Sequence, residues 1–352
     1  MAYFTSYMPS VCYSSELSGI SCSVTPGTVT LLIQSPLEVF SNTYNTPNSY
    51  INFPDFSDVV EMFMEQQKLT VADMQFIVTD AQSTVEKTIR VVYFKEEPRK
   101  FFAADILSDG LLTTYRNRVL YEDSVDYLTF WCEPNSIFVG TAVRLYVLVQ
   151  DYTGHREWIL MEYGYTIHQG INELMISFPE LRRYLPDRVR KWDILFFSFT
   201  VNQQTCNFYV GKAHNVRHFI FRNCYNAKES ISVPCISKNI TETKSSLAVC
   251  GKKQYRYDIQ HTRSFEQQTA ALDSERAAVM EQMLTSPSVQ IVFGYAYDVP
   301  IIITSYDYEL SDEPNTERTF KFEWQYENRN GVSLLEFTKE RIFSEHFTPP
   351  FV

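Results

Sequence analysis

The chain has 352 residues, of which 45% are hydrophobic and 21% are charged, and its formal net charge at pH 7 is −11. This balance excludes a disordered chain and leaves room for two or three globular domains. The acidic charge argues against specific binding of nucleic acid, because neutralising phosphates requires a basic surface. The 23 Tyr and 26 Phe, set against only 11 Gly, favour a fold built mainly of strands.

The sequence carries no recognisable signal for entry into a membrane. No Lys or Arg precedes Lys68, so neither the basic start of a secretion signal nor an Arg-rich transit peptide is recognisable. The longest apolar run, residues 192–201, is interrupted by Asp193, Ser198 and Thr200 and is shorter than the ~20 residues of a membrane span. We therefore expect no membrane partner.

The cysteines are odd in number and widely spaced, and no two of them form a CxxC pair. This pattern predicts buried thiols in a protein made in a reducing compartment, with secretion and disulfide bridges as the alternative. The seven positions are Cys12, Cys22, Cys132, Cys206, Cys224, Cys235 and Cys250.

Residues 1–110 are predicted to form a β-rich N-terminal domain. Its first 30 residues lack clear periodicity and are expected to be an extended arm or a loop-rich first layer. Residues 56–68 fit either a short helix or a strand, because their apolar positions have helical spacing while their flanks look extended. Strands are predicted at residues 28–33, 74–78 and 88–94, and a loop at residues 42–52.

Residues 111–214 are predicted to form a second domain that resembles a β-sandwich. Short strands with turns about every ~8 to 12 residues are typical of a sandwich or jelly roll. Gly154 supplies the positive φ of a hairpin turn, and residues 179–192 are expected to be a short helix or a wrapped loop. The predicted strands are residues 127–131, 143–149, 156–161, 173–178 and 193–201.

Residues 215–352 are predicted to form a β-sandwich with a single flanking α-helix at about 272–285. Asp273 or Ser274 can cap this helix, Glu275 suits its first turn, and Pro287 prevents its continuation. The side chains that share its apolar face are Leu272, Val279, Met280 and Met283. Strands are predicted at residues 217–222, at 254–259 and 263–266 as a pair, and at 289–293, 300–303, 306–310 and 320–326.

No catalytic or cofactor motif is found. The sequence contains no GxSxG elbow, Walker A run, GxGxxG turn, HExxH pair or EF-hand loop, so we predict no catalytic, cofactor or metal residue. His214 and His218 would lie about 13 Å apart on a strand, too far to share a metal. Asp307 and Glu309 share one strand face and fit the carboxylate pair of a glycoside hydrolase, but the acidic residues that follow favour a solvated face.

Two clusters of charge stand out in the sequence. We predict that they pair between adjacent copies across a subunit interface. Tyr184 and Trp192 within the basic cluster also fit a site for phosphate or stacked rings, whereas salt bridges within one surface segment are the plainer interpretation. The residues of the predicted interface are Arg182, Arg183 and Arg188 on the basic side and Asp307, Glu309, Asp312 and Glu313 on the acidic side.

The order of elements from about Phe219 to Asn328 resembles a known family. The stretches that carry it are Thr269–Glu275, the helix, Leu284–Val289, Val299–Ile301, Tyr306 and Phe320–Trp324. This order resembles the tail-tube and distal-tail family of bacteriophage virion proteins. The large N-terminal part departs from the smallest members of that family and is expected to be a peripheral or upstream domain, as in baseplate and tail-tip components. The resemblance implies a homo-oligomeric ring, usually six-fold with three-fold as the alternative, other tail proteins as partners, and a place in the virion tail after synthesis in the host cytoplasm. DNA would pass through a lumen whose negative charge keeps it from sticking.

The sequence therefore predicts a structural, non-enzymatic virion protein that needs no cofactor. A β-sandwich leaves edge strands, and pairing those edges between copies would close a ring through β contacts. The alternatives are a carbohydrate-binding or adhesive β-sandwich protein, which exposed Trp or Tyr side chains would support, and a glycoside hydrolase. Residues 343–352 are rich in Phe and Pro and are expected to form a docking arm.

Overall fold

The computed structural model describes ten stretches of the chain. They are residues 2–17, 19–53, 55–95, 102–113, 115–133, 135–201, 204–250, 253–293, 297–308 and 318–327, with the backbone alone at 109, 242–250, 253–262, 297 and 308. Strands dominate these stretches, several sheets are present and four α-helices occur, so the prediction of a mainly-β fold is confirmed. None of the helices in the described stretches has the length and apolar character needed to cross a bilayer.

The N-terminal part consists of two sheets and one helix. Its strands are β1 (Tyr3–Phe4), β2 (Val11–Tyr13), β3 (Ser21–Ser23), β4 (Gly27–Gln34), β5 (Val39–Thr46), β6 (Tyr50–Asn52), β7 (Val71–Thr79) and β8 (Thr84–Val92). The larger sheet has the order β2-β8-β7-β4-β5 and the smaller β1-β3-β6. Alternate residues of β4 and β7 are apolar and buried, which directs one face of the larger sheet into a core that also includes helix α1 (Ser57–Gln66).

One prediction for this part is wrong and two ambiguities are resolved. Of the two alternatives for the first 30 residues, the extended arm is excluded, because η1 (Ser14–Glu16) and the short strands around it bury Tyr13 and Ile20. The loop predicted at 42–52 is wrong, because these residues continue edge strand β5, turn and form β6. The side chains of β5 are mostly exposed, so its Asn and Thr residues are solvated and imitate a loop. Residues 56–68 form the helix and not the strand.

The middle part is two layers of strands with a common core. Its strands are β9 (Asn117–Tyr121), β10 (Val125–Cys132), β11 (Ala142–Gln150), β12 (Arg156–Thr166), β13 (Gly170–Ser177), β14 (Asp193–Val201) and β15 (Gln204–Gly211). A five-stranded sheet, β12-β11-β14-β15-β9, packs its inner side chains against those of the β10-β13 pair and of helix α3 (Phe178–Tyr184). Helix α2 (Ala103–Asp109) precedes this part. The hairpin predicted at Gly154 is confirmed by its φ of 89°.

The C-terminal part is a closed barrel with one helix beside it. Its strands are β16 (Val216–Arg222), β17 (Lys228–Cys250), β18 (Lys253–Thr269), β19 (Val289–Phe293), β20 (Tyr297–Tyr308) and β21 (Phe320–Tyr326), and the barrel order is β16-β17-β18-β21-β20-β19. Helix α4 (Ser274–Thr285) begins where the sequence predicts, with the Asp273 carboxylate accepting a hydrogen bond from Arg276 N at 2.9 Å. The predicted apolar face of α4 is buried in the core.

The barrel corrects three predictions from the sequence. A single sheet closes on itself here, where the sequence predicted a sandwich, so no edge strand remains within the barrel itself. The strand pair predicted at 254–259 and 263–266 is one strand, β18, and its partner is β17. Its pairing shifts register between Lys244 and Ser246, and a similar shift between Ile303 and Ser305 makes β20 look like two strands in the sequence.

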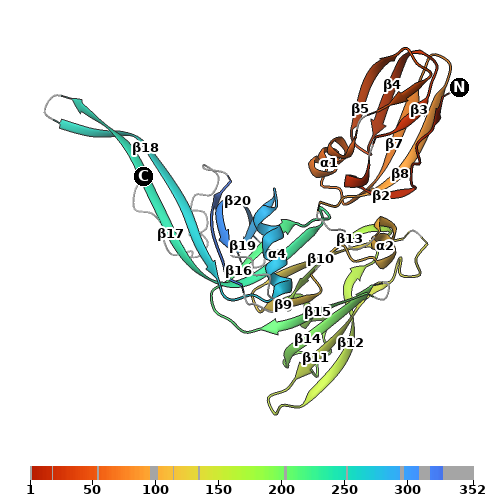
Figure 1. The fold of residues 1–352 in the computed structure, drawn as a ribbon. Helices are drawn as coiled ribbons and strands as arrows, with labels where there is room; N and C mark the ends of the chain where they lie inside the picture. The colour runs from red at the N-terminus through yellow and green to blue at the C-terminus, as the bar shows by residue number, and fades with distance from the viewer. Residues whose placement is uncertain are drawn as a thin grey trace, which may run out of the picture.

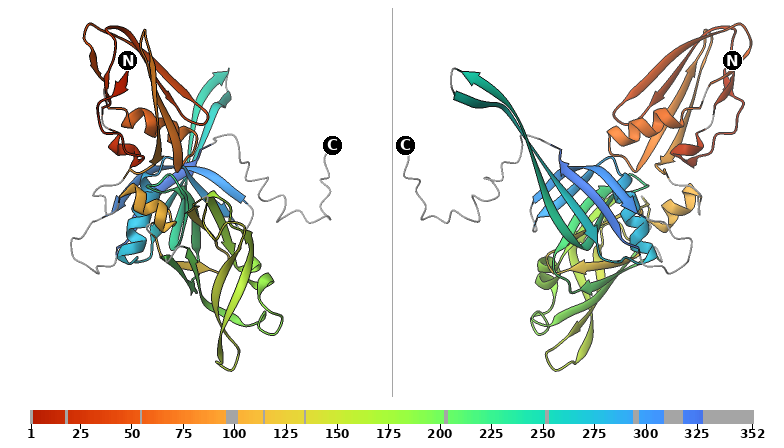
Figure 2. Two further views of the ribbon diagram at one scale, coloured as in Figure 1. Left: turned by 90° about the vertical axis from the view of Figure 1, so that its right-hand side faces the viewer. Right: turned by 60° about the vertical axis from the view of Figure 1, so that its left-hand side comes forward.

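The three parts meet at a small buried cluster. The N-terminal sheets and the five-stranded sheet lie toward opposite ends of the molecule, with the barrel between them (Figures 1 and 2). Phe94 from the N-terminal part, Ile106 of α2, Trp131 of β10 and Tyr225 of the turn between β16 and β17 belong to one apolar cluster. The domain boundaries at residues 110 and 214 stay a prediction.

Candidate assembly interface

Strands β17 and β18 continue past the barrel as a two-stranded ribbon. β16 pairs with β17 only at residues 228–234, and β21 pairs with β18 only at residues 265–268. From there β17 and β18 pair only with each other, out to Cys250 opposite Lys253. The ribbon projects as a long arm from the body of the molecule (Figures 1 and 2).

The outer edges of this ribbon have no strand neighbour within the described residues. At ~3.4 Å per residue, residues 238–250 span roughly 44 Å of strand. Each edge presents a row of backbone N–H and C=O groups, which is the arrangement that adds a strand from another chain. At the base of the ribbon, the outward-facing Ile236 side chain is 77% exposed, which adds an apolar contact point beside the edge.

The predicted basic residues lie on and after helix α3 and make contacts within their own part of the chain. Arg188 forms two hydrogen bonds with the Glu157 carboxylate, each 2.5 Å long. Arg182 Nη1 donates to the Trp192 carbonyl at 3.0 Å, and the Arg183 guanidinium lies 5.9 Å from the centre of the Tyr184 ring. These contacts hold the cluster at the surface of the middle part.

The predicted acidic residues are described only in part. Asp307 is exposed on β20, where it pairs across the strands with Lys321 of β21. Glu309, Asp312 and Glu313 lie outside the described residues. Within one chain the basic and acidic clusters belong to different parts, and their pairing between copies stays a prediction.

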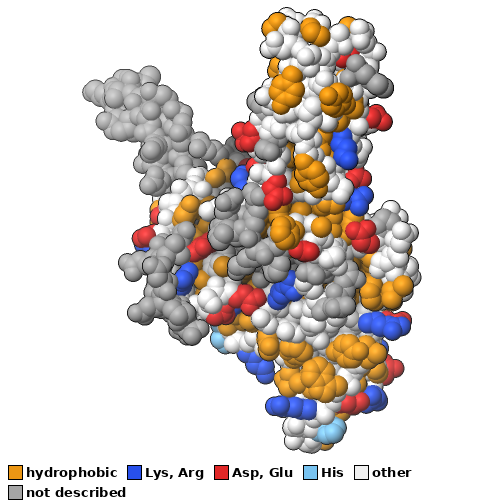
Figure 3. Space-filling model, turned by 45° about the vertical axis from the view of Figure 1, so that its right-hand side comes forward, with side chains coloured by type: hydrophobic (Ala, Val, Ile, Leu, Met, Phe, Trp, Pro, Cys, Tyr) orange, Lys and Arg blue, Asp and Glu red, His pale blue; other side chains and the backbone are white. Residues whose placement is uncertain are grey.

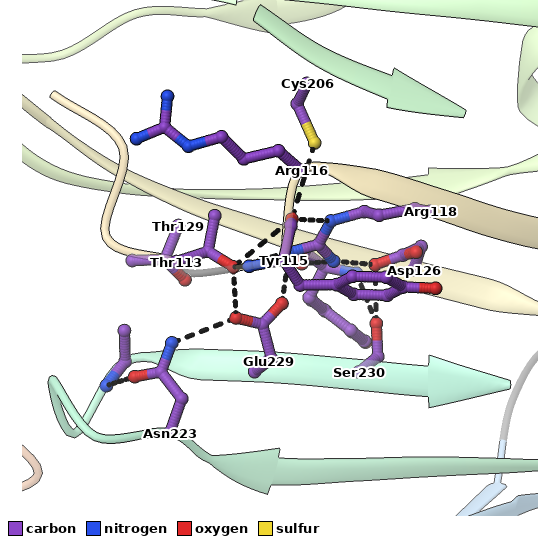
Figure 4. Close-up of polar contacts among 12 residues, drawn as sticks. Thr113, Tyr115, Arg116, Arg118, Asp126, Thr129, Cys206, Asn223, Glu229 and Ser230 are labelled. Carbon is purple, nitrogen blue, oxygen red and sulfur yellow. Dashed lines mark hydrogen bonds and ion pairs between the residues drawn. The ribbon is translucent and has the colours of Figure 1, made fainter. Parts of the chain in front are cut away.

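Arg118 is the centre of a buried polar network that joins the middle part to the barrel (Figure 4). Its guanidinium is fully buried, contacts Asp126 at 2.6 Å and forms a second ion pair with Glu229 on β17. Its Nε donates to the Tyr115 carbonyl at 3.0 Å. All three guanidinium nitrogens therefore have partners, an arrangement that the planar Arg side chain allows and Lys does not.

The carboxylates of this network are held by further donors. Glu229 accepts hydrogen bonds from Thr113 Oγ1 at 2.5 Å and from Asn223 Nδ2 at 2.9 Å. Ser230 Oγ donates to the Asp126 carboxylate at 2.6 Å. Burial raises the pKa of Glu229 in spite of these partners, whereas for Arg118 burial is outweighed by the two carboxylates and the pKa rises well above its ordinary value. The network is a rigid joint between β9, β10 and β17.

The N-terminal part is joined to the turn between β16 and β17, residues 223–227. Asn226 has a left-handed backbone, with a φ of 53°, and its Nδ2 donates to the carbonyls of Met64 at 2.9 Å and Leu69 at 3.0 Å. Lys95 N also donates to the Cys224 carbonyl at 3.1 Å. Residues 223–227 thus fix all three parts relative to one another.

A cavity of about 410 Å³ lies beside this turn, between the end of α1 and the end of α4. Its lining includes Lys95, whose ammonium is 2.8 Å from Glu65, and Arg222, whose guanidinium donates to the Asn226 carbonyl at 3.0 Å. These two contacts engage each cation within its own part of the chain, whereas the cavity is lined by residues of both the N-terminal and the C-terminal part.

The described residues offer no group of three or more His, Cys, Asp or Glu side chains that could hold a metal ion. His218 is buried, its Nδ1 lies 2.9 Å from Ser232 Oγ, and burial lowers its pKa to about 4. His214 is exposed. The six cysteines whose side chains are described are buried, and burial raises the pKa of Cys206 to about 12, which keeps it a thiol.

Sequence reasoning missed the ribbon and the buried network. The apolar alternation of β17 at Ile231, Val233 and Cys235 ends at the barrel, and residues 237–246 beyond it are mostly Lys, Asn, Thr, Glu and Ser. The network had one detectable signal, an Arg at an inward position of the alternating strand 117–121. Its partner Glu229 is 111 residues away, and only the fold brings the two together.

Comparison with known proteins gives a distant likeness. No protein-family model matches the chain, and no curated protein matches it. Among solved structures it is similar to a chain of the "Tail of empty GTA particle computed with helical refinement, C6 symmetry", with 14% identity and a TM-score of 0.24. It is also similar to a chain of the "Virion of native gene transfer agent (GTA) particle", with 14% identity and a TM-score of 0.23. Each match covers 34% of this chain and 95% of the other. A likeness of this size carries no argument about function.

Proposed function

We propose that this chain is a structural, non-enzymatic protein of a phage-like virion tail or baseplate, and that its copies form a ring through the β17–β18 ribbon. The observation that supports the proposal is the ribbon itself, whose two edges each extend for roughly 40 Å beyond the barrel without a strand neighbour in the described chain. The resemblance of residues 219–328 to tail-tube and distal-tail proteins gives the expected setting.

The sequence predicted that copies pair through the edge strands of a sandwich, but the closed barrel offers no such edge. The barrel strands are paired all round, so an arriving chain finds no open edge there. The ribbon edges have no partner among the described residues, and long exposed edges are a liability for a protein that acts alone. A ribbon that reaches a neighbouring copy makes a head-to-tail contact, and such contacts close into a ring when the rotation between copies permits.

The buried network of Arg118 and the turn at Asn226 also serve ring assembly. A ring requires that each copy present its ribbon and its receiving surface at one fixed angle. The ion pairs of Arg118 join the middle part to β17, and the hydrogen bonds of Asn226 join the N-terminal part to the turn just before β17. These contacts limit the relative motion of the three parts. Six copies are the favoured number and three the alternative, with other tail proteins as neighbours.

A ribbon truncation tests the proposal. Residues 242–262 would be replaced by Asn-Gly, which joins Thr241 to its cross-strand partner Arg263 with a tight turn and leaves the barrel pairs intact. The matched control replaces only residues 251–252 with Asn-Gly and keeps the full ribbon. Light scattering and negative-stain microscopy of the purified chains should show assemblies for the parent and the control, and monomers for the truncation. Assemblies of unchanged mass in the truncated chain, or a monomeric parent at all concentrations, would overturn the proposal.

A further inference from the structure

The outer face of the five-stranded sheet carries a strip of aromatic and aliphatic side chains. Strand pairing places Leu148 of β11 opposite both Trp158 of β12 and Phe196 of β14, and Phe196 opposite Tyr209 of β15. Side chains directly opposite one another lie on the same face. An unbroken apolar row therefore crosses four strands.

A second, shorter row lies beside the first. Leu160 and Tyr146 are cross-strand partners, each two residues along its strand from the first row. Beyond them in this row come the polar Ser198 and Asn207. The two apolar rows are called the aromatic strip, and its members are Tyr146, Leu148, Trp158, Leu160, Phe196 and Tyr209.

The strip is exposed, although its aromatic rings pack against one another. Trp158 is 58% exposed, Leu160 54%, Tyr146 51% and Tyr209 48%. The Trp158 and Phe196 rings meet edge to face at 5.8 Å, as do Phe196 and Tyr209 at 5.1 Å. Figure 3 shows hydrophobic side chains gathered over this end of the molecule, with charged side chains around them. Leaving such a cluster in water is unfavourable, and patches of this kind mark binding sites.

Polar pairs border the strip at both of its ends along the strands. Arg144 and Glu162 are 66% and 64% exposed and lie 3.5 Å apart at one end. At the other end Arg156 Nε donates to Gln150 Oε1 at 2.8 Å. The six members of the strip are uncharged and the Arg144–Glu162 pair is neutral, so Arg156 supplies the single net charge of the two bordering pairs.

The size of the strip argues against a globular partner. Four neighbouring strands span three spacings, about 14 Å, and two rows add roughly 7 Å along the strands. Because about half of Trp158, Tyr146, Tyr209 and Leu160 is exposed and an aromatic side chain presents about 150–250 Å², the strip leaves roughly 400 Å² uncovered. This is about half of the ~800 Å² that each side of a stable protein–protein interface buries. A narrow chain fits the strip better than a second copy of this protein.

We propose that the aromatic strip binds a linear, uncharged polysaccharide of β-linked hexopyranoses. When the substituents of a pyranose are equatorial, both ring faces present only C–H groups, and the hydroxyl groups form the rim. The C–H faces stack on exposed aromatic rings such as Trp158 and Tyr209, and the hydroxyls meet the donors and acceptors of the bordering pairs. The strip thus matches both surfaces of such a sugar chain, and this property is independent of ring assembly.

Binding to defined glycans tests the proposal on the full-length protein. The probes are insoluble cellulose and chitin in pull-down assays, and soluble cello- and chito-oligosaccharides in calorimetry. The variants are Trp158→Ala and Tyr209→Ala, whose exposed side chains contribute little to the core. The control is Tyr152→Ala, because Tyr152 is fully exposed at a hairpin tip of the same part and lies outside the strip.

The parent and the Tyr152 variant should bind at least one of these glycans equally. Each strip variant should bind it about five- to tenfold more weakly, the scale of one aromatic contact. Absence of binding by the parent to all four probes would overturn the proposal. So would equal binding by the strip variants, or concentration-dependent self-association that Trp158→Ala abolishes, since the last result identifies protein as the occupant.

Discussion

Arg118 Nη1 and Asp126 Oδ1 lie 2.6 Å apart in the interior, and the Arg118 side chain has no exposed surface. The same guanidinium pairs with Glu229 of the barrel, so one cation lies between two carboxylates that belong to different parts of the chain. In a dry interior such a group of charges is stable only while every member has its partner. Removing one member leaves the others charged, buried and unpaired.

Replacing Arg118 should therefore destabilise the protein strongly. We expect Arg118→Met, which keeps the length of the side chain, to lower the free energy of unfolding by about 3–5 kcal/mol. Urea denaturation followed by circular dichroism measures this loss. Arg144→Met is the matched control, since Arg144 is 66% exposed and should change stability by less than about 0.5 kcal/mol. Equal midpoints for the two variants would contradict a structural role for the network.

The Asn226 turn predicts a graded series. Asn226→Gly keeps the left-handed backbone but loses both hydrogen bonds to the α1 end, and should cost about 1–3 kcal/mol. Asn226→Ala also forces a side chain into a φ of 53° and should cost about 1 kcal/mol more. Thermal unfolding of both variants gives the order. An Ala variant as stable as the Gly variant would show that the left-handed φ at this position causes no strain in a residue with a side chain.

The elements that local chemistry determines could be predicted from sequence. Helix α4 has its cap at Asp273, its stop at Pro287 and an apolar face in between, and all of these signals lie within 15 residues. The long strands β18 and β20 were each divided in two, because a register shift interrupts the alternation that defines a strand. Barrel closure depends on pairs such as Phe219 opposite Ile291, and no local pattern reports them.

The candidate sites also depend on contacts between distant residues that local sequence patterns do not show. Strand 143–149 is apolar on both faces, which is typical of a strand covered on both sides, and so the exposure of Tyr146 was not evident. The polar ribbon gives little signal in the sequence, because its strands are stabilised by each other's backbones more than by a core. The partner that allows Arg118 to be buried, Glu229, is 111 residues away in the sequence, and no local pattern connects the two.

His218 predicts a pH dependence in the mildly acidic range. Burial lowers the pKa of this side chain from 6.5 to about 4, with Asp123 opposing and Arg217 adding to the shift. Between these two values the unfolded chain binds a proton that the folded chain does not, so stability falls as the pH is lowered from about 6.5 to 4. The contribution is at most roughly 3 kcal/mol.

The His218→Gln variant isolates this contribution. Gln can keep a hydrogen bond to Ser232 and has no proton to bind, so its stability should change less between pH 7 and pH 4 than that of the parent. Urea midpoints at half-unit pH intervals give both curves, and carboxylates elsewhere cancel in their difference. Parallel curves would mean that His218 does not titrate in this window.

Charge reversal tests the predicted pairing between copies. Arg182→Glu, Arg183→Glu and Arg188→Glu together should reduce the mass of the assembly measured by light scattering, because like charges would then face one another across the subunit boundary. The loss should be greatest at low salt, since screening weakens contacts between exposed charges. Arg144→Glu with Arg156→Glu alters the charge of the same part on its outer sheet face and serves as the control. Adding Asp307→Lys to the triple variant should restore part of the assembly, whereas an unchanged mass in the triple variant would remove these residues from the interface.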